Sequence, residues 1–174
     1  MPQRLFIGTA GWSIPRGFAP QCGEPGTHLE RYARVFRGAE INSSFYRPHA
    51  AATYAKWASC TPPGFQFAVK VPRLLTHELA LRRARAGLAQ FLAESAGLGE
   101  KRGPLLVQLP GSHLFDGRVA GRFFALVRSL YEGPAVCEPR HRASSKPRAC
   151  SEGWAWCSSL SSSFRICPCS TTAR

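Results

Sequence analysis

The chain has 174 residues, of which 44% are hydrophobic, so it is long enough to form one domain with a buried core. No apolar run approaches the roughly 18 residues that a membrane helix needs. The first residues also lack the layout of a signal peptide, so we expect a cytoplasmic protein without a membrane partner. The net charge of +13 is carried mostly by scattered arginines, with one cluster at Arg82, Arg83 and Arg85. Such charge attracts phosphates loosely, although dispersed charge is more often a solvated surface.

The cysteine pattern argues against a zinc site or a secreted disulfide scaffold. Three of the seven cysteines are scattered singly through the first 141 residues. The other four are crowded near the end, without CxxC pairs and with no histidine among them: Cys150, Cys157, Cys167 and Cys169. We therefore expect no metal or other cofactor.

Strand-like and helical stretches alternate in the first half of the chain. In chain order we expect a strand at 4–9, a helix at 27–36, a strand at 39–42 and a helix at 50–60. Thr27 and Glu30 have the spacing of a capping box, which marks the start of the first helix.

The same alternation continues in the second half. We expect a strand at 65–71, a loop at 72–78, a helix that ends near 98, a strand at 104–109, a helix that starts at 116 and a strand at 134–138. Asp116 can cap the last helix. The strand at 104–109 is a continuous apolar run, as in buried parallel sheets.

Five strands separated by helices predict an α/β fold with a parallel sheet, either an open doubly wound sheet or a (β/α)₈ barrel. Neither GxGxxG nor GxxxxGK[ST] is present. Each strand carries polar groups where it ends: Thr9; Glu40 and Asn42; Lys70; Gln108; Glu138 with Arg140 and His141. In a barrel these ends share one rim, where active sites lie, so the pattern favours the barrel.

The rim residues suit acid/base chemistry. Glu40 and Glu138 could divide the roles of acid and base, and Lys70 could bind an anion or act as a nucleophile. His77 and His141 could transfer protons near neutral pH. A structural role remains an alternative for each residue. The two glutamates and two histidines could also bind a metal ion, but no HExxH-type spacing supports a metal site.

Five motifs within residues 4–141 resemble the DUF72 family, also called UPF0759: IGTAGW, EINSSFYR, FQFAVKVPRLLTH, LGEKRGPLLVQLP and VCEPRH. The resemblance implies a TIM-barrel-like fold with a polar pocket at the carboxyl ends of the strands, and no established reaction. The motif positions in this chain are Gly11, Trp12, Glu40, Asn42, Phe45, Tyr46, Lys70, His77, Gln108, Glu138, Arg140 and His141.

The chain divides at His141 into a family-like domain, residues 1–141, and a Ser/Cys-rich tail, residues 142–174. The tail departs from the family pattern and shows no helical face or long strand alternation. Our hypothesis is a frameshift or sequencing error just after His141. The alternative is a genuine, divergent, disordered tail. A frameshift would leave about five strands of the barrel, and we expect such a truncated chain to be inactive.

The leading functional hypothesis is a small-molecule enzyme, a hydrolase or isomerase acting on a sugar-like or anionic substrate. Its catalytic candidates are Glu40, Glu138, Lys70, His77 and His141, and its substrate-binding candidates are Gly11, Trp12, Asn42, Phe45, Tyr46, Gln108 and Arg140. The alternative is a protein that binds or processes nucleic acid, as the net charge suggests. A third hypothesis is the inactive product of a broken gene.

Overall fold

The computed structural model describes residues 5–114, 116–140 and 164–167. Its strands are β1 (Phe6–Thr9), β2 (Gly38–Ile41), β3 (Gln66–Lys70), β4 (Arg102–Leu109), β5 (Ala135–Pro139) and β6 (Phe164–Cys167). Its α-helices are α1 (His28–Val35), α2 (Ala51–Ser59), α3 (Arg85–Ser95) and α4 (Gly117–Leu130). Three 3₁₀ segments, Arg16–Cys22, Ser43–Phe45 and Ala96–Lys101, and one π-helical turn, Leu74–Glu78, lie between them.

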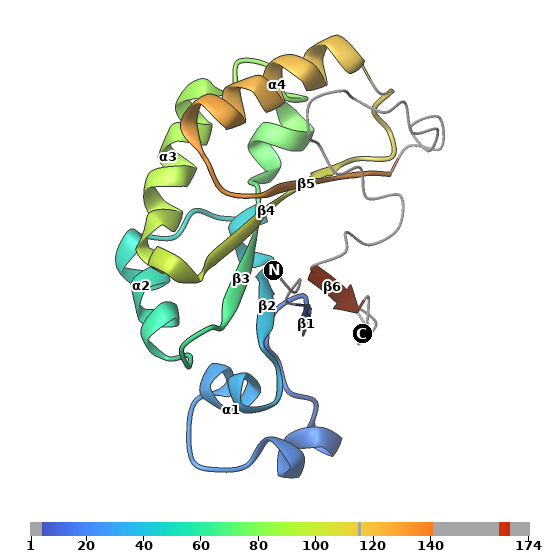
Figure 1. Cartoon of the computed structure of the whole chain (residues 1–174). Helices are drawn as coiled ribbons and strands as arrows, with labels where there is room; N and C mark the ends of the chain where they lie inside the picture. Colours follow the sequence, from blue (N-terminus) through green and yellow to red (C-terminus); the bar gives the residue numbers. More distant parts are fainter. Residues whose placement is uncertain (1–4, 115, 141–163, 168–174) are drawn as a thin grey trace.

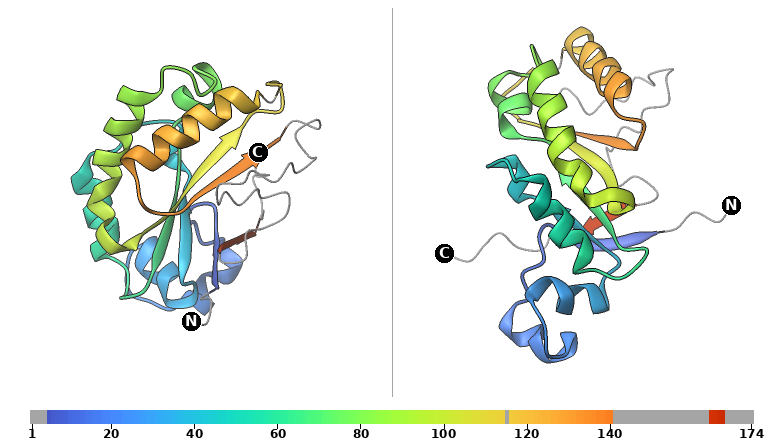
Figure 2. Two further views of the ribbon diagram at one scale, coloured as in Figure 1. Left: turned by 45° about the horizontal axis from the view of Figure 1, so that its top comes forward. Right: turned by 90° about the vertical axis from the view of Figure 1, so that its left-hand side faces the viewer.

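The main sheet has four parallel strands in the order β2-β3-β4-β5. Strand β1 pairs in parallel with β6, and a single bridge between Ala10 and Glu40 connects β1 to β2. Helices α2, α3 and α4 lie on one side of the main sheet, and α1 lies near the start of β2 (Figures 1 and 2). The expected α/β fold with a parallel sheet is therefore confirmed.

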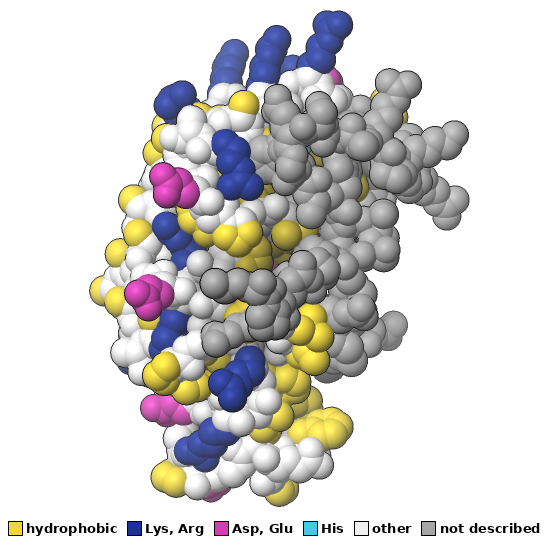
Figure 3. Space-filling model, viewed as in Figure 1, with side chains coloured by type: hydrophobic (Ala, Val, Ile, Leu, Met, Phe, Trp, Pro, Cys, Tyr) yellow, Lys and Arg dark blue, Asp and Glu magenta, His cyan; other side chains and the backbone are white. Residues whose placement is uncertain are grey.

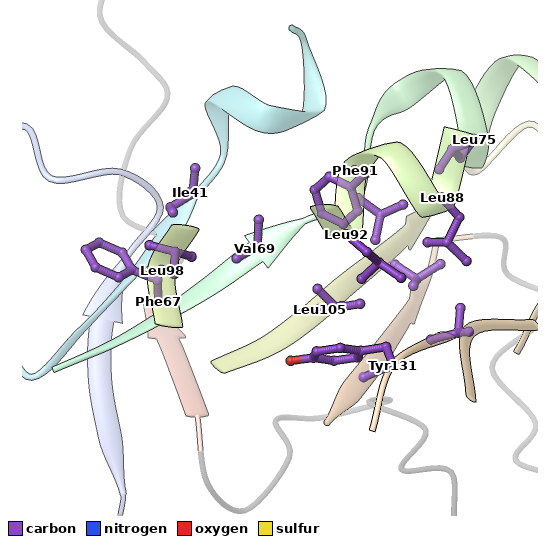
Figure 4. Packing of buried hydrophobic residues seen from close by; sticks show 14 of the residues in the cluster. Ile41, Phe67, Val69, Leu75, Leu88, Phe91, Leu92, Leu98, Leu105 and Tyr131 are labelled. Carbon is purple, nitrogen blue, oxygen red and sulfur yellow. The ribbon is translucent and has the colours of Figure 1, made fainter. Parts of the chain in front are cut away.

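Alternation along the strands sends apolar side chains toward the helices. Ile41, Phe67, Val69, Leu105 and Val107 are fully buried on this side of the sheet. They belong to one cluster with helix residues that include Leu88, Phe91 and Leu92, together with Leu98 of the following 3₁₀ segment (Figure 4). The next residues along the strands point to the opposite face of the sheet, which leaves that face for polar groups.

Local capping explains where two of the helices begin. The side chain of Thr27 accepts a hydrogen bond from the Glu30 backbone, and Glu30 accepts one from the Thr27 backbone, so the predicted capping box is present. Asp116 accepts hydrogen bonds from the backbone N–H groups of Arg118 and Val119. Both caps satisfy N–H groups that have no partner within the helix.

Two expectations differ from the structure. Residues 74–78, expected as a loop, form a π-helical turn. Within the tail, expected to be irregular throughout, residues 164–167 form β6 against β1, so the expectation is wrong for these four residues. The frameshift hypothesis rests mainly on residues 141–163 and 168–174, which lie outside the described residues. Among the described helices, none is long and apolar enough to cross a membrane.

The contact between β1 and β2 gives a stability prediction. A Cβ atom added at Gly8 would overlap the carbonyl group of Gly38, whereas one added at Gly121 in α4 meets nothing within 4 Å. Gly8→Ala should lower the free energy of unfolding by about 1–3 kcal/mol, since the two strands must separate to admit the methyl group. Gly121→Ala should raise it by about 0.5–1 kcal/mol through helix propensity. Urea unfolding measures both, and equal effects would contradict the close approach of the strands.

Candidate functional site

Four polar side chains share the face of the sheet opposite the helices, near the carboxyl ends of the strands. Glu40 and Lys70 come from β2 and β3, and Gln108 and Glu138 lie side by side on β4 and β5. Strand alternation places them there, because Ile41, Val69, Val107 and Cys137 point the other way into the core. Four of the predicted strand-end groups are thus gathered on one surface.

Lys70 is the most closely surrounded of these groups. Its Nζ donates to Asn42 Oδ1 at 3.0 Å and lies 4.0 Å from Glu40 Oε1. The ammonium group also lies 4.7 Å from the centre of the Phe45 ring, within the range of a cation–π interaction. Three predicted site residues therefore contact a single buried amine.

Burial changes the protonation of this pair. Glu40 is only 4% exposed and Lys70 only 8%. Desolvation raises the pKa of Glu40, and the nearby Lys70 charge only partly opposes this effect. Desolvation also lowers the pKa of Lys70, again opposed in part by Glu40. Each group is therefore closer to its neutral form than it would be in water, which suits groups that exchange protons.

Glu138 is held on both of its carboxylate oxygens. Gln108 Nε2 donates to Oε2 at 2.8 Å, and Arg140 Nε donates to Oε1 at 3.1 Å. The Glu138 side chain is 37% exposed, so it is much more open to solvent than Glu40. Both Glu138 and Arg140 act electrostatically on Glu40, which brings the two carboxylates into one electrostatic unit.

The segment after β2 fixes the backbone around the pair. The buried hydroxyl of Ser44 lies 2.8 Å from the Ile41 carbonyl oxygen and 2.7 Å from the Lys70 carbonyl oxygen, so it connects the ends of β2 and β3. The backbone N–H groups of Gly11 and Asn42 donate to the Glu40 carbonyl. Gly11, a predicted substrate-binding residue, has a φ of 76°, a conformation that favours glycine, so in the structure it turns the backbone beside Glu40.

His77 lies in the π-helical turn at the border of the group. Its Nδ1 lies 2.8 Å from Thr76 Oγ1, and its ring packs edge-on against Phe45. Desolvation lowers the pKa of His77, and surrounding positive charges, including Arg73 and His113, lower it further. The neutral imidazole is therefore favoured at neutral pH.

Trp12 and Tyr46, two predicted substrate-binding residues, pack against other aromatic rings. Trp12 packs edge-on against Trp57 and Phe67, which places its ring against the core. Tyr46 is 70% exposed and contacts Phe45. The structure therefore brings together Glu40, Asn42, Phe45, Lys70, His77, Gln108, Glu138 and Arg140. His141 lies outside the described residues.

Ser44 and Thr76 support the site and were missed by the sequence reasoning. Both lie beside predicted residues, in the stretches NSSFY and LLTHE, and both are almost completely buried. The Ser44 hydroxyl bonds to the Lys70 carbonyl, which only the folded chain brings close, whereas the Thr76 hydroxyl bonds locally, to the Pro72 carbonyl and to His77 Nδ1. Within the part of the chain that the structure describes, no group of three or more His, Cys, Asp or Glu residues could hold a metal ion.

Comparisons with known proteins give one family. The family model described as "Protein of unknown function DUF72" matches residues 6–166 and so runs past His141. The UPF0759 protein YecE of Escherichia coli K12 is 30% identical over 108 residues, 62% of this chain and 38% of that protein. The UPF0759 protein YunF of Bacillus subtilis 168 is 32% identical over 72 residues, 41% of this chain and 26% of that protein.

Two solved structures share the fold. A DUF72 family protein from Enterococcus faecalis V583 matches with a TM-score of 0.67 and 21% identity, over 82% of this chain and 53% of that chain. A DUF72 family protein from Thermotoga maritima MSB8 matches with a TM-score of 0.64 and 26% identity, over 79% of this chain and 56% of that chain. The present chain thus spans less than two thirds of the length of these relatives.

The raised pKa of Glu40 predicts a pH-dependent effect of Glu40→Gln on stability. The folded chain holds this proton more tightly than the unfolded chain. Its stabilising effect is therefore complete below the ordinary carboxyl pKa, about 4.3, and is lost as the pH rises through the raised value. Gln has no carboxyl proton to lose, so the variant does not lose this stability. The free energy of unfolding of Glu40→Gln, relative to wild type, should therefore rise from acid to neutral pH.

Urea unfolding across this pH range measures the difference. Glu132→Gln is the matched control, because this substitution removes the same charge from a carboxylate that is exposed to solvent. If the difference between Glu40→Gln and wild type did not change with pH, Glu40 would not be desolvated in the way described.

Proposed function

Because this chain belongs to the DUF72 family, we propose that it carries the acid/base site of a small-molecule enzyme, a hydrolase or isomerase. The observation that carries the proposal is the desolvated pair of Glu40 and Lys70 beside Glu138, which Gln108 and Arg140 orient. Pairs of carboxylates in different surroundings commonly divide the roles of acid and base.

The proposed roles follow from burial and hydrogen bonding. Glu40, whose pKa is raised, is the proton donor. Glu138 is the proton acceptor, because hydrogen bonds from Gln108 and Arg140 hold its carboxylate in place. Its side chain is 37% exposed, so water or a substrate can reach it. In a hydrolase, Glu138 would take a proton from water while Glu40 protonates the leaving group. In an isomerase, Glu138 would take a proton from carbon while Glu40 protonates the neighbouring oxygen.

Lys70 and His77 have supporting roles in this proposal. The Lys70 ammonium stabilises negative charge that develops on the substrate, and Asn42 and Phe45 hold it in position. His77 has a lowered pKa and supplies a neutral imidazole that can donate or accept a hydrogen bond. His141, next to Arg140 in the sequence, stays a candidate for proton transfer.

The proposed framework is a TIM-barrel-like fold. The sheet is parallel with helices on one side, and the register between neighbouring strands favours strands that tilt relative to a barrel axis. Glu40 pairs with Ala68 rather than with Lys70, and Lys70 pairs with Leu106 rather than with Gln108, so the polar position moves along the strands from β2 to β3 and from β3 to β4. Gln108 and Glu138 lie directly opposite each other on β4 and β5. Barrels need such a stagger for their strand ends to form a level rim.

The test of function is turnover by the chain, which the frameshift hypothesis expects to be absent and a genuine tail would permit. Candidate substrates are aldoses, ketoses and their phosphates, with deuterium uptake from heavy water reporting isomerisation, and nitrophenyl glycosides and phosphate esters reporting hydrolysis. Glu138→Gln should lower turnover by roughly 10²–10⁴-fold and leave the melting temperature nearly unchanged. Glu132→Gln, an exposed carboxylate outside the site, should leave turnover unchanged. Retained turnover in Glu138→Gln would remove Glu138 from the mechanism.

A second candidate function is the binding or processing of nucleic acid, which the net charge of +13 favours. Lys and Arg side chains are spread over the face shown in Figure 3, with Asp and Glu among them. This distribution supports weak, non-specific attraction better than a dedicated groove. If this function holds, the chain should bind DNA and RNA with an affinity that falls steeply with salt, and the absence of this salt dependence would overturn it.

A further inference from the structure

We propose that the Lys70 amine forms a covalent imine with an aldehyde or ketone group of the substrate, and that Glu40 supplies the proton for this step. This inference rests on the proposed acid/base function and names the substrate class for it, a small hydroxy-aldehyde or hydroxy-ketone. Lysine amines in desolvated surroundings are known nucleophiles toward carbonyl carbon.

The Lys70 amine has few partners for a buried group. Its Nζ donates one hydrogen bond, to Asn42 Oδ1, and it makes no other within the described residues. An ammonium group has three N–H donors, so the remaining sides of this one are open to a substrate. The Lys70 side chain keeps 10% of its exposure and is therefore not sealed from solvent.

Lys101 shows how a structural lysine is bound in the same chain. Its Nζ donates to the carbonyl oxygens of Ala58 and Thr61 and to the Thr61 hydroxyl, which uses all three donors. Desolvation lowers the pKa of Lys101 as it lowers the pKa of Lys70, so burial does not distinguish the two. The difference is the number of acceptors, three at Lys101 and one at Lys70.

Glu40 is the proton donor that matches this amine. Its Oε1 lies 4.0 Å from Lys70 Nζ, and neither carboxylate oxygen accepts a hydrogen bond from a described residue. A buried carboxylate without donors is costly as an anion, and desolvation accordingly raises the pKa of Glu40. The protonated carboxyl group therefore lies beside the position that a group bound to Nζ would occupy.

Imine formation at this pair balances without an outside reagent. The neutral amine adds to the carbonyl carbon, and one amine proton moves to the carbonyl oxygen to give a carbinolamine. The nitrogen lone pair then expels the hydroxyl group, which takes the Glu40 proton and leaves as water. The products are a protonated imine and the Glu40 carboxylate.

The protonated imine suits isomerisation rather than hydrolysis. Its positive nitrogen accepts the electron pair when Glu138 takes a proton from the neighbouring carbon, so it stabilises negative charge as the ammonium would. Return of the proton to a carbon atom and addition of water to the imine then release the product and restore the Lys70 amine.

The test is reductive trapping on the 174-residue chain. The chain is incubated with glycolaldehyde, and sodium cyanoborohydride reduces any imine to a stable 2-hydroxyethyl group on lysine Nζ. Peptide mass spectrometry compares Lys70 with the exposed Lys56 and with Lys101. We expect Lys70 to be labelled about tenfold faster than Lys56, because a positioned acid contributes roughly 10²–10⁴-fold and outweighs slower access. In urea the lysines should react at similar rates.

Two variants test the proton donor. Glu40→Gln should slow the labelling of Lys70 by roughly 10²-fold, although loss of the neighbouring negative charge would by itself leave more of the amine neutral. Glu132→Gln, which removes an exposed carboxylate, should leave the labelling unchanged. Circular dichroism checks that both variants fold, and the comparison of lysines in the wild-type chain depends on neither.

Each outcome decides the inference. Labelling of Lys70 no faster than that of Lys56 overturns it, since the amine would then have no special reactivity. Unchanged labelling in Glu40→Gln removes Glu40 as the donor and overturns it too. The failure of the proposed function looks different: Glu138→Gln would keep turnover while Lys70 was still labelled first.

Discussion

Alternation along four parallel strands is the constraint on which both the core and the candidate site depend. Along each strand, every second side chain packs against the helices, and the side chains between them point to the opposite face of the sheet. Glu40 and Lys70 lie on that second face but are still buried, so each would be costly as a lone charge. Their mutual attraction reduces this cost only in part, which leaves both groups with shifted pKa values. The shifted pKa values of the pair are thus a consequence of its position in the sheet.

A second layer of hydrogen bonds keeps the strand ends in register. Ser44 connects the carbonyls of Ile41 and Lys70, and Tyr32 donates to the Gly38 carbonyl while it accepts from the Thr9 backbone. These hydroxyls satisfy backbone groups where the sheet ends or changes partner, which would otherwise be buried without partners. Because the same strands carry Glu40 and Lys70, the bonds also limit the motion of the charged pair.

The strand-end chemistry was predictable from the sequence because a parallel sheet brings the carboxyl ends of its strands together. The clustering of Glu40, Lys70, Gln108 and Glu138 needed no knowledge of side-chain packing. The orientation of Trp12 was not predictable, since it depends on contacts with α2 and β3 that are distant in sequence. The turn at residues 80–83 adopts φ values that local preferences disfavour, and β6 pairs with a strand at the other end of the chain. Tertiary contacts decide all three.

Exposure changes across the candidate site in a way that suits a substrate with one charged end. Glu40 and Lys70 are almost excluded from water, whereas Glu138 and Arg140 are more open to it. A charged end of a substrate would keep much of its hydration at the open side, beside Glu138 and Arg140. The reacting part lies at the dry side, where a charge on Glu40 or Lys70 acts more strongly than it would in water. Anchoring and chemistry would therefore have different solvent environments within one site, with Arg140 on the open side because it is exposed and donates to Glu138.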